Sequence, residues 1–462
     1  MRARKLIRPA ICSALFLCLT LCAGAQEGKI SISLQDCLKE AENNSVEIKN
    51  ARLDFLQAKA TKSEVWQMWL PQVSINAGGY YALKPLLRVD LQDILGTTTW
   101  GMTLADIITT AASEMGIKPY YANLQKGYMV GVGALQPIFT GGRLLNANKL
   151  ASVGVEAAEL RRGMAMRTTR DSVETKYLRI LSLQEKFAVV SAARALLDTL
   201  EKDVNCGVES GVMTQGELLE VRLHKSELNQ RELLLKRGLK LLKMDLFNTA
   251  GMPWSYSLLD KYSLSEEGLV STEKPPKDYI VPEEEAVACY ESRLLDLLVE
   301  SKRLEKKIAV GSSLPQIGAG FSYGYSNLIE RHTGRFNGVG FVTLQIPITG
   351  AITNAQRIRK SNYELEKALN TQEYATAQLR LQLQMLQVEM ETAWDCLQNA
   401  AEAETLCRET VRKMQAGFDA GTVAMNELLK GQLDLQEASC KTADARAEYR
   451  KAIRRYLLRI SL

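Results

Sequence analysis

Two stretches of the sequence decide the fold: WLPQVSINAGGYY, residues 69–81, and SLPQIGAGFSYGY, residues 313–325. In both, a charged, leucine-rich segment runs into Leu-Pro-Gln and then into alternating apolar and small residues. Because proline cannot continue a helix, Pro71 and Pro315 predict a switch from helix to strand. The two motifs are 244 residues apart, so the chain makes the same switch twice.

The residues that follow each switch have the pattern of a membrane-spanning barrel strand. After Pro315, apolar side chains recur at every second position with glycine or polar residues between them, and after Pro71 the alternation is weaker. A lipid-facing barrel strand requires an apolar outward face and a polar or small inward face. The predicted strand pairs are 72–83 with 128–138 and 316–326 with 336–346, and the return strands end at Pro137 and Pro347.

Four membrane strands in one chain leave two open edges, and the hydrocarbon core of a bilayer does not tolerate unpaired backbone groups. The smallest closed membrane barrels have about eight strands, so one chain cannot close a barrel alone. Two copies would supply about eight strands and three copies about twelve. The strand count therefore predicts an oligomer.

The chain also shows an internal duplication. CGVESGVMTQGELLE from Cys206 resembles QAGFDAGTVAMNELLK from Gln415, and the glycines of the two segments match at an offset of 210 residues. LQPIFTGGRLLNA from Leu135 likewise resembles LQIPITGAITNA from Leu344. Together with the two Leu-Pro-Gln motifs, three landmarks recur in the same order, which indicates two structural repeats.

Long helical hairpins are predicted between these landmarks. From Leu379 to Met414 apolar residues follow the four-three spacing of a heptad seam, interrupted by Glu404, and the same seam 210 residues earlier has Arg194 at the polar position. A polar residue inside such a seam usually sets the register of the helices. The predicted hairpins are 143–250 and 353–460, and shorter helices, 34–69 and 283–312, lead into the two switches.

The N-terminus has the features of a secretory signal peptide rather than of a folded segment. A basic start, an apolar stretch from Ala10 to Leu21 and the small residues at 23–25 predict cleavage after Ala25. Lipidation of Cys22 is the alternative. The predicted organisation is a signal peptide at 1–25, a first repeat at 26–252, a linker at 253–282 and a second repeat at 283–462.

The arrangement of LPQ, two strands, LQPIFTGGR, a long helix, a glycine-bearing turn and a return helix, all duplicated, resembles the TolC-type outer-membrane efflux proteins. The resemblance implies a mostly helical protein with membrane strands, in which a homotrimer forms a 12-stranded β-barrel that continues into a long coiled-coil α-barrel. It implies a passive exit duct of a tripartite efflux or type I secretion system, embedded in outer-membrane lipid. The implied partners are a periplasmic adaptor protein and an inner-membrane transporter of the resistance-nodulation-division or ABC type.

The resemblance also implies sites at the periplasmic tips of the hairpins, where the family carries acidic residues that narrow the channel. The gate hypothesis places Glu217 and Glu427 in a constriction, with Glu220 and Lys430 beside them, and Lys430 departs from the family because an acid is expected there. First-turn glutamates favoured by the helix dipole are the alternative reading. The predicted tip turns and adaptor contacts are Gly207, Gly211, Val212, Met213, Gly417, Gly421, Thr422 and Val423.

Besides Lys430, two further features depart from the family pattern. The second copy reads PITGA where the family often has an aromatic residue and two glycines, so its entry into the long helix is expected to differ. The first strand pair is interrupted by an insert, residues 84–119, whereas the second pair is joined by a short connection. A long extracellular loop is the simplest interpretation of the insert, and a surface lid or partner contact is the alternative.

Other classes of protein are disfavoured by the composition. The two histidines, His224 and His332, lack a spaced set of Cys, Asp or Glu, so we expect no enzyme activity, metal or cofactor. The net charge is +5, and it falls to +1 once the four basic residues of the signal peptide are removed, which gives no indication of nucleic-acid binding. A periplasmic adaptor with a long helical hairpin is the alternative function.

Overall fold

The computed structural model describes residues 30–84, 86, 88–90, 99–115, 120–266, 273, 289–327, 334–347 and 350–460. The predicted signal peptide and His332 lie outside the described residues. In chain order the elements are β1 (Ile30–Ile32), α2 (Leu34–Asn44), α3 (Val46–Gln67), β2 (Gln72–Tyr81), β3 (Arg88–Asp90), α5 (Thr99–Glu114), β4 (Tyr120–Asn123), β5 (Lys126–Phe139), α6 (Arg143–Glu209), α7 (Gln215–Ala250), η1 (Tyr256–Lys261), β6 (Tyr262–Leu264), α9 (Tyr290–Gly311), β7 (Gln316–Asn327), β8 (Arg335–Gln345), α10 (Gly350–Asp419) and α11 (Met425–Ile460).

The chain divides into two compact units, each built from both halves of the sequence. Unit 1 contains residues up to Leu53 together with Leu160–Arg293 and Ala375–Leu462, and unit 2 contains Asp54–Glu159 and Leu294–Tyr374. These units do not correspond to the two successive repeats predicted from the sequence, and the repeats remain a prediction based on sequence similarity. None of the described helices is long and apolar enough to cross a bilayer.

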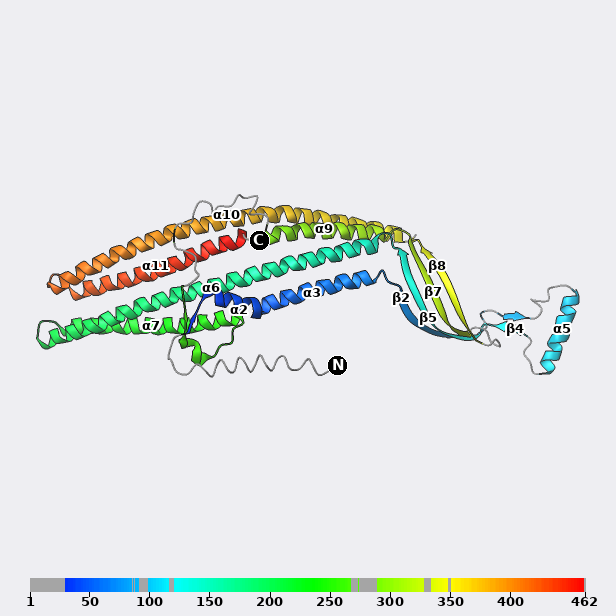
Figure 1. Ribbon diagram of the computed structural model, residues 1–462, viewed down its shortest axis with the longest axis horizontal. Helices are drawn as coiled ribbons and strands as arrows, with labels where there is room; N and C mark the ends of the chain where they lie inside the picture. The colour runs from blue at the N-terminus through cyan, green and yellow to red at the C-terminus, as the bar shows by residue number, and fades with distance from the viewer. Residues whose placement is uncertain are drawn as a thin grey trace. The chain divides into compact units, whose positions relative to one another are not determined.

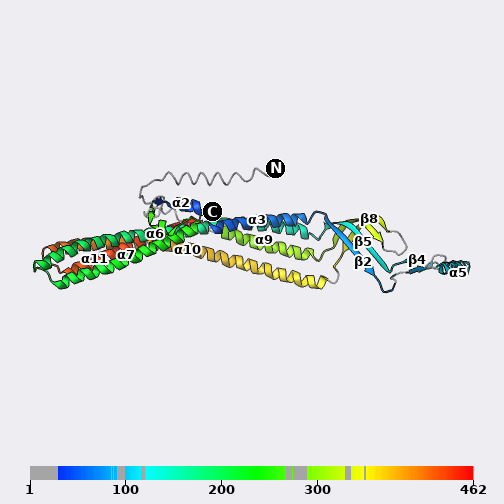
Figure 2. The ribbon, with the colours of Figure 1, turned by 90° about the horizontal axis from the view of Figure 1, so that it is seen from below.

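Unit 1 contains two antiparallel helical hairpins, α6 with α7 and α10 with α11 (Figures 1 and 2). The predicted heptad seam is the buried stripe of α10, where Leu383, Met390 and Leu397 pack against Tyr449 and Tyr456 of α11. The polar seam position is also satisfied, since a carboxylate oxygen of Glu404 accepts hydrogen bonds from Ser439 at 3.1 Å and Arg408 at 2.8 Å. The bond from Ser439 crosses from α11 to α10 and holds the register of the hairpin, whereas the bond from Arg408 lies within α10.

Ion pairs join the two halves of the chain within unit 1, because α6 from the first half lies against α11 from the second. Glu174 is 2% exposed and its carboxylate binds Arg454 through two contacts, of 2.5 and 2.9 Å. Glu185 binds Arg446 at 2.9 Å. Burial raises the pKa of Glu185 above its ordinary value. The positive charge of Arg446 and the hydrogen bond that it donates oppose this rise.

Two expectations about unit 1 need correction. The helix predicted over 34–69 is two helices, α2 and α3, because the backbone of Ser45 is extended (ψ 132°). Asn43, Asn44 and Ser45 have polar side chains that compete with the backbone for hydrogen bonds, so a break at this point is favourable. The predicted linker is in part a core element, since Leu259 and Leu264 are buried and β6 pairs in parallel with β1.

Unit 2 contains a four-stranded antiparallel sheet in the order β2-β5-β7-β8 (Figure 1). Among the described strands, β2 and β8 form its edges. Strand β5 continues to Phe139, so Pro137 does not end it as predicted; the register between β5 and β7 shifts at this point. A bulge tolerates proline because it frees the residue from donating to the ladder. Pro347 follows β8, as expected.

Candidate membrane sheet and helical tips

The sheet of unit 2 presents one almost wholly apolar face. Antiparallel register places Ile75, Val132, Tyr323 and Gly338 side by side across the four strands. Neighbouring rows of the same face contain the aliphatic and aromatic positions predicted from the sequence, including Phe321. Large apolar side chains are exposed on this face, for example Ile75 at 78%. Such an exposed apolar sheet requires a partner or a bilayer to cover it.

The opposite face of the sheet is richer in small and polar residues. Gly131 and Gly324 meet at the centre of the sheet, where a Cβ on Gly324 would lie 2.5 Å from the Cα of Gly131. Ser74 and Asn76 of β2 lie on the same face, and Phe341 covers Gly320. The alternation of an apolar and a small or polar face is the pattern of a strand between lipid and an aqueous lumen.

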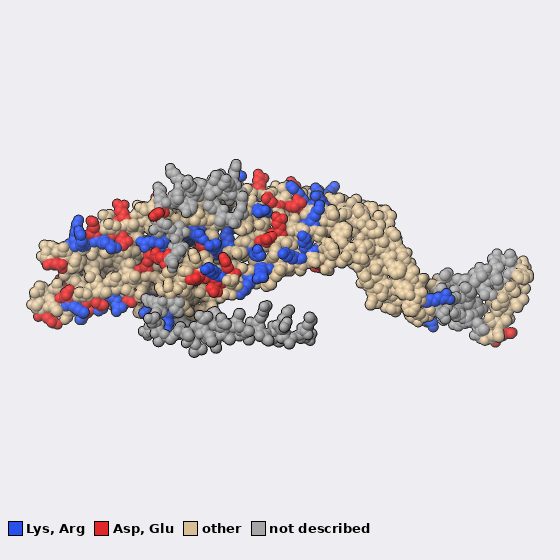
Figure 3. Space-filling model, in the orientation of Figure 1, with Lys and Arg blue, Asp and Glu red and all other residues tan. Residues whose placement is uncertain are grey.

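Charge is almost absent from the sheet. The four strands are 10 to 14 residues long, which suffices for tilted strands to cross a bilayer. Their charged residues are Lys126 and Arg335, the first residues of β5 and β8, which share one end of the sheet. In Figure 3 the surface over the middle of the sheet shows no charged side chains and blue atoms lie only at its far end, whereas the helices carry many charged side chains.

Aromatic rings gather at the end of the sheet where Lys126 and Arg335 lie. Tyr128 and Tyr325 are 6.0 Å apart between ring centroids, and Phe336 lies 5.4 Å from Tyr325 and 6.0 Å from Tyr323. Aromatic girdles of this kind mark the interface between membrane and water in barrels.

The predicted switches from helix to strand lie at the other end of the sheet. Helices α3 and α9 end shortly before Pro71 and Pro315, and β2 and β7 begin with the following residues. The entry into α6 requires two glycines, since Gly141 and Gly142 have φ of +62° and +77°. Gly141 also faces Gly311 of α9 so closely that a Cβ would lie 2.3 Å from the Gly311 carbonyl oxygen, a contact that the sequence did not reveal. The corresponding PITGA turn lies partly outside the described residues.

The two hairpin tips of unit 1 have matching backbone geometry. Gly211 and Gly421 both lie in the left-handed region, with φ of +76° and +72°. The carbonyl of Gly207 accepts hydrogen bonds from the backbone N–H groups of Val212 at 2.9 Å and Met213 at 3.1 Å. The carbonyl of Gly417 accepts the equivalent bonds from Thr422 at 2.8 Å and Val423 at 3.3 Å. The offset of 210 residues therefore recurs in the hydrogen bonds as well as in the sequence.

The first glycine of each tip has a different role from the second. Gly207 and Gly417 lie inside α6 and α10 and their carbonyls accept the hydrogen bonds of the turn, whereas Gly211 and Gly421 supply its left-handed residue. A Cβ on Gly207 would lie 2.9 Å from the side chain of Met213, and one on Gly417 would lie 2.6 Å from that of Val423. These glycines make room for the side chains that close the turn. Val212 is 81% exposed and Thr422 is also exposed.

The structure distinguishes the two glutamates of the gate hypothesis. Glu217 belongs to a capping box: its carboxylate accepts from the backbone N–H of Thr214 at 2.7 Å and from its hydroxyl at 2.9 Å. The spacing Thr-x-x-Glu is a signal for this cap that is readable in the sequence. At the equivalent of Thr214 the second tip has Ala424, which cannot cap, and Glu427, Lys430 and Glu220 are exposed.

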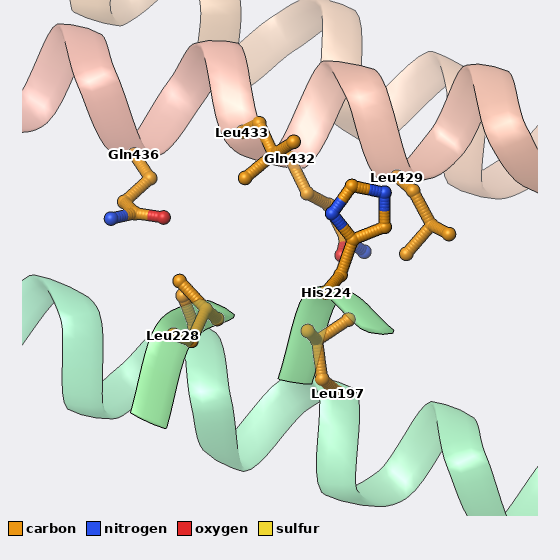
Figure 4. Close-up of a pocket in the computed structure, with 8 residues that line it drawn as sticks. Leu197, His224, Leu228, Leu429, Gln432, Leu433 and Gln436 are labelled. Carbon is orange, nitrogen blue, oxygen red and sulfur yellow. The ribbon is translucent and has the colours of Figure 1, made fainter. Parts of the chain in front are cut away.

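Behind the tips, the two hairpins share a core. Residues of α6, α7 and α11 form one buried cluster that includes Leu197, Leu228 and Leu429. Figure 4 shows the His224 ring extending from α7 toward Gln432 of α11 beside a cavity of about 10 Å³, room for about one water molecule. The Nδ1 atom of His224 lies 3.3 Å from a carboxylate oxygen of Glu227. This arrangement packs the two hairpins together.

A second charged cluster in unit 1 surrounds Glu291. Its carboxylate binds both Arg167 and Arg459, and Arg459 also donates to Gln382 at 3.1 Å. Burial alone would raise the pKa of Glu291, but the hydrogen bond from Arg167 and the charge of Arg459 outweigh it and lower the pKa below the usual value. Within the described residues, no group of three or more His, Cys, Asp or Glu side chains could hold a metal ion.

Comparison with known proteins gives matches by structure only. No protein-family model and no curated protein matches the chain by sequence. The outer membrane protein VceC of Vibrio cholerae has 11% identity and a TM-score of 0.73, over 92% of this chain and 95% of that one. The CmeC outer membrane channel of Campylobacter jejuni has 14% identity and a TM-score of 0.70, over 95% and 90%.

The open state of the MtrE outer membrane channel of Neisseria gonorrhoeae matches similarly, with 13% identity and a TM-score of 0.70 over 95% of this chain and 92% of that one. All three matches cover the strands and the long helices together, because each spans nearly the whole chain. The chain therefore has the TolC-type fold of these outer-membrane channels.

Proposed function

We propose that this protein is the outer-membrane channel of a tripartite efflux or type I secretion system, a passive exit duct that continues through the periplasm. The observation that carries the proposal is the sheet of unit 2. It is apolar and aromatic on one face, is charged only at one end, and has two edges, β2 and β8, that pair with no other described strand. Soluble proteins rarely leave such a sheet exposed and unpaired.

The unpaired edges support assembly into a homotrimer. The edge strands β2 and β8 have nearly equal lengths of 10 and 11 residues. Strand β8 of one protomer can therefore pair with the full length of β2 of the next protomer. Three copies of a four-stranded sheet close a barrel of about twelve strands, within the range of membrane barrels. Outer-membrane lipid then covers the apolar face, and the small and polar face lines the lumen.

The hairpin tips are the proposed docking ends for a periplasmic adaptor, which couples the duct to an inner-membrane transporter. The exposed residues Val212 and Thr422 flank the left-handed glycines and are accessible to such a partner. For the gate, the capping box of Glu217 makes Glu427 the stronger candidate, with Lys430 one turn later on the same helix. Replacing Glu427 by Gln should change the cation selectivity of the channel, whereas Glu217→Gln should mainly destabilise the start of α7.

The decisive experiment is membrane fractionation followed by native mass spectrometry and planar-bilayer recording of the purified protein. We expect an outer-membrane trimer that conducts ions, with an N-terminus at Gln26 if cleavage follows Ala25. A monomer found in the soluble or inner-membrane fraction, without channel activity, would contradict the proposal and favour an adaptor. Unchanged ion selectivity of the Glu427→Gln channel would contradict the gate hypothesis but would not affect the proposal that the protein is an exit duct.

A further inference from the structure

The helices that adjoin the sheet are strongly basic at the ends nearest to it. At one end of the sheet, α3 and α9 lead into β2 and β7, while β5 and β8 lead into α6 and α10. The ten residues of each helix nearest the sheet are 58–67, 143–152, 302–311 and 350–359. Together they contain ten basic and two acidic residues, a net charge of +8. The next ten residues of the same four helices contain seven basic and seven acidic residues, so the positive excess ends abruptly.

Most of these cations are exposed, with no counter-charge among the described residues. Lys302 pairs with Glu305 at 2.7 Å, and Arg303 approaches Glu300 at 3.7 Å. The other eight form no salt bridge with a described residue, and all but Lys306 are exposed: Lys59, Lys62, Arg143, Lys149, Lys306, Lys307, Arg357 and Arg359. These ten cations form the basic belt, and in Figure 3 blue atoms lie on the helices beside the uncharged part of the sheet.

Three cations of the belt gather where α6 begins and α9 ends. Arg303, Lys307 and Gly311 are four residues apart, so they share one face of α9. The side chain of Arg143 crosses the end of this face, because a Cβ on Gly311 would lie 3.0 Å from its Cγ atom. Like charges one turn apart on a helix repel each other. The cluster therefore favours the binding of an anion from outside the chain.

The level of the cluster matches the surface of a membrane that covers the sheet. Arg143 follows the end of β5 by four residues, and Lys307 lies four residues, or about 6 Å, before the end of α9. Side chains of Lys and Arg lay their apolar stems along a surface and extend their charged groups to the headgroups of lipids. Trp66 and Trp69, which precede β2, are 54% and 37% exposed, and tryptophan is enriched where a protein meets the membrane–water interface.

We propose that the basic belt binds the phosphate groups of anionic phospholipids in the periplasmic leaflet of the outer membrane. The inference rests on the proposed function, because a duct anchored in the outer membrane brings the belt to that leaflet. Two observations favour lipid as the occupant: the charge of the belt is complementary to anionic headgroups, and the belt directly continues the apolar sheet. A belt that lined the lumen would instead act on the ions that pass through the channel.

The test is native mass spectrometry of the purified full-length trimer with phosphatidylglycerol or phosphatidylcholine at equal concentration. The wild type should bind phosphatidylglycerol more tightly, since this lipid carries a net negative charge and phosphatidylcholine does not. A triple variant, Arg143→Gln with Arg303→Gln and Lys307→Gln, should bind phosphatidylglycerol about tenfold more weakly. If the triple variant binds this lipid as tightly as the wild type does, the proposal is overturned.

Two control variants show whether charge at this place is responsible. Lys202→Gln with Arg412→Gln and Lys413→Gln removes three exposed cations within ten residues of the tip ends of α6 and α10, and it should bind phosphatidylglycerol as the wild type does. Arg143→Lys with Arg303→Lys keeps the charges of the belt and should also retain the lipid. Equal weakening in the tip variant and the belt variant would overturn the proposal.

Three readouts separate the possible failures. The same spectra report the trimer: a monomer contradicts the proposed function and the belt with it, whereas a trimer without preference for phosphatidylglycerol overturns the belt alone. Planar-bilayer recording of the triple variant reports the lumen alternative, and altered ion selectivity with unchanged lipid binding would overturn the proposal. Inorganic phosphate, added at constant ionic strength, should not displace phosphatidylglycerol; displacement would assign the belt to free anions and overturn its role as a lipid site.

Discussion

Replacement of Glu174 by Gln should strongly destabilise unit 1. The carboxylate is 2% exposed and binds Arg454 of α11 through contacts of 2.5 and 2.9 Å, and Arg170 at 3.3 Å. Gln keeps the size of the side chain but removes the negative charge, so Arg454 loses its partner. Removing one member of a buried ion pair typically costs about 3–5 kcal/mol.

Thermal unfolding of the purified protein, followed by circular dichroism of the helices, measures the effect. At about 2 °C per kcal/mol for a unit of this size, the midpoint should fall by roughly 6–10 °C. A matched control is Glu437→Gln, which breaks an exposed pair with Lys441 one turn apart on α11 and should leave the midpoint unchanged.

A double variant, Glu174→Leu with Arg454→Met, tests the reasoning further. Because apolar residues of similar size often replace a buried pair without loss, the double variant should recover most of the stability lost by the single one. If Glu174→Gln shifts the midpoint no more than the Glu437→Gln control does, the pair does not join α6 to α11 as the geometry indicates.

Three other outcomes are expected. Gly324→Ala should lower the yield of heat-modifiable trimer on gels, because its Cβ would meet the backbone of β5 at 2.5 Å, while Gly340→Ala, with nothing within 4 Å, should not; equal yields would contradict the close approach. In urea unfolding, Gly421→Ala should lower the free energy of unfolding by about 1–2 kcal/mol, because alanine disfavours the φ of +72° at this position. Gly154→Ala, in the interior of α6, should instead raise the free energy of unfolding by about 0.5–1 kcal/mol. A Gly421→Ala variant more stable than wild type would contradict the left-handed turn. Because the folded pKa of Glu291 is lowered, its stabilisation is complete above the ordinary glutamate pKa, declines as pH falls below that value and is lost once pH has fallen through the lower folded pKa. The stability difference between wild type and Glu291→Gln should therefore shrink as the solution is acidified below the ordinary pKa, and a difference that does not depend on pH would contradict the shift.

The sequence by itself determined the four long strands, the two long helical hairpins and their order. The Leu-Pro-Gln switches, the period of two in the strands and the heptad seam of α10 are local patterns, and local patterns need only neighbouring residues to be read. The same holds for the duplication, since an offset of 210 residues is visible without any contact. The capping box at Thr214 is also local, because the spacing Thr-x-x-Glu can be read from neighbouring residues.

Only the tertiary structure decided which distant residues meet. Gly141 must be small because Gly311 approaches it, and Glu174 is buried because Arg454, 280 residues later, lies opposite. The two glycines of a hairpin tip show the same contrast. The positive φ of Gly421 is a local requirement of the turn, whereas the need for a small residue at Gly417 depends on where the side chain of Val423 packs. Packing depends on the geometry of the folded chain, and sequence spacing does not encode it directly.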